Sequence, residues 1–185
     1  MPEYPIAENY SLETFLSKGG VITYGTLVLE NELRISTPTD PLFVIEIAPA
    51  TSLGAIIQSN STLSKNAVVV AMSGSIFVGY GNSSLPSKEY NVYTDITASQ
   101  YVYNASWLYP LCMAPLDTTI FDQFNGGTYA NLLKANTSAH PFVVSILNHY
   151  EVWYANGGSS FYAILPFSPL TGTSTMYDVQ VYFCL

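Results

Sequence analysis

Short runs of apolar residues recur along the chain, and most have the length and the residue types of β-strands. The clearest lie at 21–29, 42–47, 67–72 and 75–80 and are rich in valine, isoleucine and other strand-forming residues. β-Branched and aromatic side chains fit the pleated surface of a sheet. The pattern therefore predicts a chain built mainly of strands from residue 19 onward.

The second half of the chain continues this pattern. Val179, Val181 and Phe183 alternate with polar residues near the end, so they are expected on one face of a strand. Further strands are expected at 53–58, 90–103, 142–147, 151–154, 161–167 and 178–183.

Only two stretches in the middle of the chain favour helix, at 117–124 and 128–135. Each is about two turns long, which suits an insertion between strands. Asp117 follows Pro115, and a carboxylate there is typical of a helix N-cap.

These elements predict an all-β fold, a two-sheet antiparallel sandwich with short helical insertions. Connections without helices of regular length argue against a parallel α/β sheet. We favour a single jelly roll, with an immunoglobulin-like or other sandwich as the alternative. Residues 1–18 hold two prolines and three glutamates and are expected to form an N-terminal arm, which leaves 19–185 as the β-sandwich (jelly-roll) domain.

The composition changes what such a domain is expected to bind. The chain of 185 residues is 49% hydrophobic but only 10% charged, and its formal net charge is −8. This balance argues against direct contact with nucleic acid, whose phosphates need clustered cations. A neutral polar surface also stays hydrated at low pH, which suits an acidic exterior. The N-terminus shows no secretory signal, and no run is long enough to span a membrane.

The sequence lacks the motifs of known catalytic and phosphate-binding sites. There is no Gly-X-Ser-X-Gly elbow and no phosphate-binding loop. His140 and His149 are the only histidines, too few for a cupin-type metal site, and Cys112 and Cys184 fit either one disulfide or two thiols. We therefore expect no catalytic, cofactor-binding or metal-binding residues, no cofactor and no enzymatic activity.

Glu46 is the one acid that interrupts a strongly apolar strand. A carboxylate in a buried strand needs a partner. Arg34 is the only arginine and is one candidate partner, while an edge position open to water is the other interpretation.

Five Asn-X-Ser/Thr triplets predict possible N-glycosylation. Most fall in or beside expected loops, where a glycan is tolerated. The asparagines are Asn9, Asn60, Asn82, Asn104 and Asn136.

Several features of the chain together resemble those of a known protein family. They are the start without a signal, the short arm, strands rich in Tyr, Val, Ile and Thr, the few charges and the glycosylation triplets. Residues 19–185 look like single jelly-roll capsid or turret proteins of icosahedral viruses that infect thermoacidophilic archaea. The resemblance implies a virion location and a β-sandwich that self-associates in a shell. It also implies contacts with other virion proteins. Because the arm is acidic, an internal membrane or a DNA-coating protein would separate this shell from the genome.

The function expected from the sequence is therefore a non-enzymatic structural subunit of a virion shell, either a capsid or a surface protein. It would self-assemble as a homo-oligomer through aromatic and neutral polar interfaces, because tyrosine and tryptophan are common at such surfaces. The alternatives are an extracellular surface filament subunit joined by strand donation and a carbohydrate-binding β-sandwich module.

Overall fold

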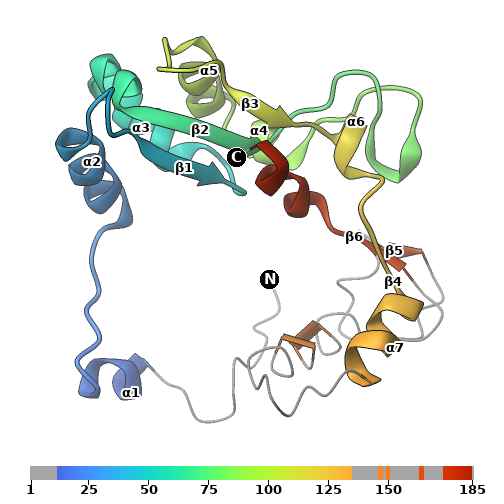
Figure 1. The fold of residues 1–185 in the computed structure, drawn as a ribbon. Helices are drawn as coiled ribbons and strands as arrows, with labels where there is room; N and C mark the ends of the chain where they lie inside the picture. Colours follow the sequence, from blue (N-terminus) through green and yellow to red (C-terminus); the bar gives the residue numbers. More distant parts are fainter. Residues whose placement is uncertain (1–11, 135–145, 148, 151–162, 165–172, 185) are drawn as a thin grey trace. The chain divides into compact units, whose positions relative to one another are not determined.

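The computed structural model describes residues 12–134, 146–147, 149–150, 163–164 and 173–184 (Figure 1). The contacts divide the chain into two compact units. The large unit comprises Thr23–Asp122 and Tyr177–Leu185, and the small unit comprises Met1–Ile22 and Gln123–Met176.

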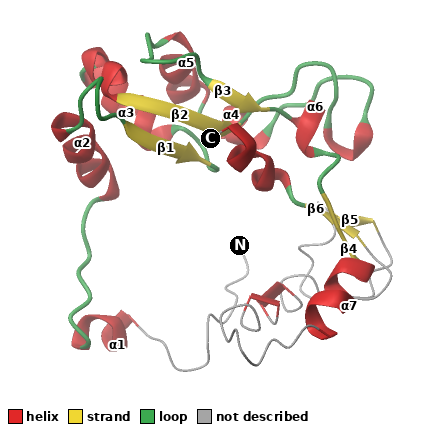
Figure 2. Ribbon diagram, viewed as in Figure 1, coloured by secondary structure: helices red, strands yellow, loops and turns green. Residues whose placement is uncertain are grey.

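A three-stranded parallel sheet is the frame of the large unit. It consists of β1 (Leu42–Glu46), β2 (Ala67–Met72) and β3 (Cys112–Ala114), in the order β1-β2-β3. Figure 2 shows the three strands as yellow arrows that run in the same direction. Their carboxyl ends therefore meet at one edge of the sheet.

Helices connect the parallel strands, as a parallel pair requires a crossover. α3 and η1 lie between β1 and β2 along the chain, and α4 and α5 lie between β2 and β3. The helical elements of this unit are α2 (Gly25–Ile35), α3 (Thr51–Ser59), η1 (Ser61–Asn66), η2 (Tyr80–Asn82), α4 (Tyr90–Thr94), α5 (Ile96–Asn104), α6 (Leu116–Thr119) and η5 (Tyr177–Cys184).

The central strand β2 is buried on both faces. Ala67 and Val69 pack in a cluster with residues of α2, α3 and α5 on one face. Val70 and Met72 pack on the other face with residues of α6 and η5. Burial on both faces explains why β2 is a continuous apolar run rather than an alternating one.

The 90–103 segment forms two helices although its tyrosines and valines favour strand. The side chain of Glu89 caps α4, and the side chain of Asp95 caps α5 by accepting a hydrogen bond of 2.9 Å from the Ala98 N–H. Ala98 and Val102, four residues apart, are buried on one face of α5. Capping and helical burial therefore outweigh the strand propensity of the tyrosines.

α2 likewise replaces an expected strand and turn. Leu33 is buried against the sheet layer, and Arg34 binds Glu30 one turn earlier, with 3.1 Å between Nε and Oε1. This i,i+4 pair is typical of a helix surface.

The small unit holds a short antiparallel sheet in the order β4-β6-β5. Phe124 of β4 makes edge-to-face contacts with Tyr129 and Tyr150. The described elements of this unit are α1 (Leu12–Ser17), β4 (Gln123–Asn125), α7 (Gly126–Lys134), β5 (Ala163–Ile164) and β6 (Thr173–Thr175). No helix in the described part of the chain is long and apolar enough to cross a membrane.

The expected all-β fold, a sandwich or single jelly roll, is wrong. The strands predicted at 42–47 and 67–72 are present, and so is the helix predicted at 128–135. However, the runs at 53–58, 90–103 and 178–183 are helical, because their apolar residues are buried by helix packing rather than by strand alternation.

The strand expected at 75–80 is also wrong, because this segment is a loop that leads into η2. The other strand predictions and most of the arm were not tested. Residues 142–145 and 151–154, and most of 161–167, lie outside the described residues, as do residues 1–11 of the arm. The division at residue 18 stays a prediction.

Candidate functional site

The carboxyl edge of the β1-β2-β3 sheet is the first place to look for a site. In open sheets of parallel strands, ligands bind outside the carboxyl ends of the strands. Here that edge carries Glu46 at the end of β1, Ser73 and Gly74 directly after β2, and Asp117 shortly after β3. Glu89 also bonds to this edge from the start of α4.

Glu89 organises the centre of the edge. Its side chain is 3% exposed. Oε2 accepts hydrogen bonds from the N–H groups of Gly74 (3.0 Å) and Val92 (3.1 Å), and Oε1 accepts from the N–H of Asn91 (2.8 Å) and the hydroxyl of Tyr80 (3.4 Å). The carboxylate therefore joins the end of β2 to the start of α4.

Asn91, two residues after Glu89, also joins the start of α4 to the end of β2. Its Nδ2 donates a hydrogen bond of 2.9 Å to the carbonyl oxygen of Met72, the last residue of β2. The side chain is buried, so the bond satisfies a polar group that water does not reach.

A second polar pair lies beside Gly74. The hydroxyl groups of Ser73 and Tyr103 are 2.6 Å apart, and Ser73 is buried. Burial raises the pKa of Tyr103 above its usual value, and the negative charges of Glu89 and Glu46 raise it further, whereas the Ser73 bond lowers it. Glu46 pairs in register with Ala71 of β2, two residues before Ser73, so the end of β1 lies beside this pair.

Glu46 has an unusual environment for a carboxylate. Desolvation by burial raises its pKa from 4.5 to about 7. Its Oε2 atom is buried and has no hydrogen-bond partner. A carboxyl group with a pKa near neutrality at the edge of a sheet can exchange a proton at physiological pH.

Neither interpretation of Glu46 from the sequence was complete. Arg34 binds Glu30, so the expected pair with Glu46 is not formed. β1 is an edge strand among the described residues, but the carboxyl group is not open to water on both oxygens.

Asp117 holds the loop that follows β2. Its carboxylate accepts hydrogen bonds from the N–H groups of Ile76 (2.8 Å), Phe77 (2.7 Å) and Val78 (3.2 Å). These bonds, that of Ile76 first, lower the pKa of Asp117. The predicted N-cap role is therefore wrong, because Pro115 occupies the N-cap of α6 and Asp117 caps a distant loop.

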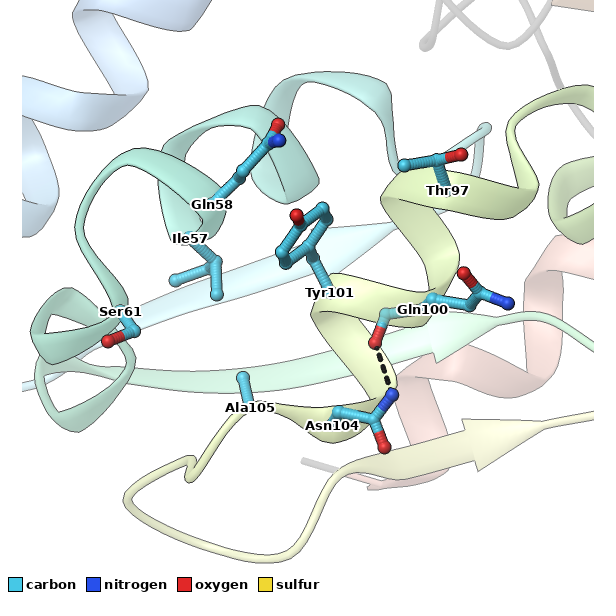
Figure 3. Close-up of a pocket in the computed structure, with 8 residues that line it drawn as sticks. All are labelled: Ile57, Gln58, Ser61, Thr97, Gln100, Tyr101, Asn104 and Ala105. Carbon is cyan, nitrogen blue, oxygen red and sulfur yellow. Dashed lines mark hydrogen bonds between the residues drawn. The ribbon is translucent and has the colours of Figure 1, made fainter.

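A groove between α3 and α5 is the other hollow of interest (Figure 3). It is lined mainly by neutral side chains, among them Gln58, Gln100 and Tyr101. Figure 3 shows Tyr101 and Asn104 on α5 and Gln58 on α3. The groove offers no carboxylate or histidine, so it is unsuited to acid–base chemistry near neutral pH.

Metal and thiol chemistry find no support among the described residues. No group of three histidine, cysteine or acidic side chains there is placed to hold a metal ion. Cys112 of β3 is disulfide-bonded, and the only other cysteine in the chain is Cys184.

The possible glycosylation sites are scattered over the structure and remain a prediction. Asn60 accepts hydrogen bonds from Thr62 and caps η1, while Asn104 is exposed at the end of α5, where its Nδ2 donates to the Gln100 carbonyl. Asn82 is the last residue of η2. Asn9 and Asn136 lie outside the described residues.

Fold and edge together define an α/β protein with a cluster of bonded polar side chains at the carboxyl ends of its parallel strands. The chain belongs to the inosine-uridine preferring nucleoside hydrolase family, which matches residues 25–181. A comparison with curated protein sequences finds no match.

Solved structures of nucleoside hydrolases share the fold of this chain. An inosine-guanosine nucleoside hydrolase is 16% identical, with a TM-score of 0.66 over 95% of this chain and 50% of the other. A plant nucleoside hydrolase is 13% identical, with a TM-score of 0.69 over 89% and 47%. The inosine-uridine preferring nucleoside hydrolase from Bacillus anthracis is 14% identical, with a TM-score of 0.60 over 91% and 63%. The chain thus spans about half the length of the first of these structures.

Family membership corrects the functional expectations from the sequence. The resemblance to viral jelly-roll capsid and turret proteins is wrong, and with it the virion shell role, the virion location and the non-enzymatic assignment. The alternatives of a surface filament subunit and a carbohydrate-binding sandwich are also unsupported, since both required a β-sandwich. The predicted self-association and lack of nucleic-acid contact remain predictions.

The sequence analysis missed Ser73, Glu89, Asn91 and Tyr103. One local signal was available, because Glu89 directly precedes the helix Tyr90–Thr94, and an acid in that position is a helix-start pattern. Contact between Ser73 and Tyr103, 30 positions apart, had no such signal.

Proposed function

We propose that this chain binds a ribonucleoside at the carboxyl edge of its parallel sheet and takes part in hydrolysing the bond between the sugar and the base. The observation that carries the proposal is the polar edge itself, in a member of the nucleoside hydrolase family: Glu46 ends β1, and Glu89 and Tyr103 bond to Gly74 and Ser73 directly after β2.

The reaction explains why carboxylates suit the site. Water adds its oxygen to C1′ of the ribose, the bond from C1′ to the base nitrogen breaks, and the base nitrogen takes up a proton. Positive charge develops on the sugar ring in the transition state of such a reaction, and fixed negative charge stabilises it.

Glu46 is the described group of this edge best suited to move that proton. Its neutral acid form is favoured below a pKa of about 7. As the bond to the base breaks, the acid gives its proton to the base nitrogen, and the carboxylate later recovers the proton that the attacking water loses. In this role the rate falls as pH rises through about 7, because the ionised carboxylate has no proton to give.

Glu89 and Asn91 have a different role. Their hydrogen bonds go to the protein's own backbone, so they position the edge rather than react. Removing them is expected to disturb the fold as well as binding.

The test combines a binding and a hydrolysis assay. Equilibrium dialysis with inosine, uridine and ribose measures binding, and release of the free base is followed by chromatography. The variant Glu46→Gln keeps the size of the side chain but removes the exchangeable proton, and Glu32→Gln on the exposed face of α2 is the matched control.

We expect Glu46→Gln to lower the rate of inosine hydrolysis by about 100-fold, within the usual range for a general acid, while Glu32→Gln matches the unmodified chain. A riboside with 4-nitrophenolate as leaving group needs no proton from the protein, so its hydrolysis should fall much less. If the unmodified chain neither binds nor cleaves any of these compounds, the proposed function is wrong.

A further inference from the structure

The loop between β2 and α4 displays apolar side chains beside the candidate site. Phe77 is 74% exposed and Ile76 is 56% exposed. Phe77 lies three residues beyond Gly74, whose N–H binds the site residue Glu89. Three residues reach at most about 10 Å, so the backbone of Phe77 stays near the carboxyl edge.

The backbone of this loop is held in place where the ring emerges. Asp117 accepts hydrogen bonds from three consecutive N–H groups, those of Ile76, Phe77 and Val78. Asp117 follows the end of β3, so the loop after the central strand is fastened to the neighbouring strand.

Further bonds close the loop on itself. The Ser75 hydroxyl donates to the Val78 carbonyl (2.8 Å) and accepts from the Ser87 N–H (2.8 Å), and the Ser87 hydroxyl accepts from the Tyr80 N–H (3.0 Å). A Cβ added at Gly79 would lie 2.6 Å from the backbone carbonyl oxygen of Leu85, so this closure requires glycine.

An exposed aromatic ring on an ordered backbone is suited to binding a flat ligand. Exposed apolar area is unfavourable in water, and covering it on binding recovers that free energy. Because the loop is already ordered, little conformational entropy is lost when the ring is covered.

We propose that Phe77 determines base recognition, with its ring stacked on the nucleobase of a nucleoside whose sugar lies at the carboxyl edge. This inference rests on the proposed function and adds the residue that contacts the base.

Aromatic stacking accepts any base, because every base has a π-face. The proposal therefore predicts that Phe77 contributes to affinity for inosine and uridine alike, and contributes nothing to affinity for free ribose. A packing role for the ring would not separate nucleosides from ribose in this way.

The experiment measures dissociation constants for inosine, uridine and ribose by equilibrium dialysis in four variants. Phe77→Ala removes the ring, Phe77→Leu keeps apolar bulk without a π-face, and Phe77→Trp restores an aromatic surface. Leu85→Ala, at a 70% exposed residue of the same loop, is the matched control.

We expect Phe77→Ala to weaken inosine and uridine binding about 10-fold and to leave ribose binding unchanged. Phe77→Leu should recover little of the loss, Phe77→Trp most of it, and Leu85→Ala should bind all three compounds as the unmodified chain does.

Three results overturn the inference while the proposed function stands. They are equal weakening of nucleoside and ribose binding in Phe77→Ala, no weakening of either, and an equal effect from Leu85→Ala. A change only in self-association, measured by sedimentation, assigns the ring to an interface and also overturns it. If the unmodified chain binds neither nucleosides nor ribose, the proposed function fails and this inference fails with it.

Discussion

Carboxyl groups lie in opposite environments on the two sides of the sheet's carboxyl edge. Beside β2 and β3, Glu89 and Asp117 accept hydrogen bonds from backbone N–H groups on both oxygens. Beside β1, the Oε2 atom of Glu46 is buried without a partner, and the pKa of Glu46 rises to about 7. The hydrogen-bonded carboxylates fix the shape of the edge, whereas Glu46 is the group to which we assign proton transfer in the proposed reaction.

This difference has a thermodynamic side. A buried carboxylate with several donors is costly to remove, because its donors lose their partner. A carboxyl group that is held neutral by burial is unfavourable for the fold at high pH, since the charged form is better solvated in the unfolded chain. The carboxylates that stabilise the fold therefore lie beside β2 and β3, and the carboxyl group proposed to transfer a proton lies beside β1.

The largest expected effect comes from Glu89→Ala. The change leaves a buried donor on Asn91 and half-buried donors on Gly74, Val92 and Tyr80 without their acceptor. We expect the free energy of unfolding to fall by about 4 kcal/mol, as for a broken buried polar network. Urea denaturation at pH 7 measures the loss, and Glu32→Ala on exposed α2 should change it by less than about 0.5 kcal/mol. A loss of under about 1 kcal/mol for Glu89→Ala would contradict the structural role.

Next in size is the pH dependence removed by Glu46→Gln. The folded-state pKa of Glu46 is raised from 4.5 to about 7, so the folded chain binds more protons between these values and its stability falls as pH rises through them. The variant has no proton to lose. Its stability relative to the unmodified chain should therefore increase by about 2 to 3 kcal/mol between pH 4 and pH 8.

Denaturant midpoints at both pH values measure this change. The same comparison for Glu32→Gln provides the control, since Glu32 is exposed. Parallel pH profiles for Glu46→Gln and the unmodified chain would show that Glu46 titrates normally and would remove the contrast between the two sides.

The smallest expected effect is that of Tyr103→Phe. The substitution leaves the buried Ser73 hydroxyl without its partner at 2.6 Å, which should lower the free energy of unfolding by about 1 kcal/mol. Adding Ser73→Ala should restore part of the loss, because the orphaned hydroxyl is then gone. Tyr101→Phe, on the groove side of the same helix, should have little effect. Additive effects of Tyr103→Phe and Ser73→Ala in a double-mutant cycle would show that the two hydroxyl groups do not interact.

Part of the fold was predictable from the sequence. Residues 67–72 form a continuous apolar run of strand length, and such runs are typical of strands buried on both faces. The same rule pointed toward a parallel sheet, but tyrosine-rich helices were taken for strands. The cap acids Glu89 and Asp95, each directly before a helix, were the local evidence against that interpretation.

The site was less accessible to sequence reasoning. Glu46 was singled out, since an acid in an apolar strand is readable from a single chain. The rest of the edge was not predictable, because Tyr103 and Glu89 reach the residues after β2 only through the strand order and the crossover helices, and strand order is a non-local property. Arg34, one of the two interpretations offered for Glu46, pairs instead with Glu30, which the helix places one turn away.

Gly54 of α3 affects the position of Tyr103 at the carboxyl edge, although it lies on a different helix. A Cβ there would lie 2.6 Å from both the Cα and the Cβ of Ala98, so α3 and α5 touch only because one carbon atom is missing. α5 carries Tyr103, and a phenol ring has a fixed length. A methyl group at Gly54 would push α5 away from α3 and move the Tyr103 hydroxyl away from Ser73. A residue without a side chain on a neighbouring helix therefore sets the position of a polar group at the candidate site.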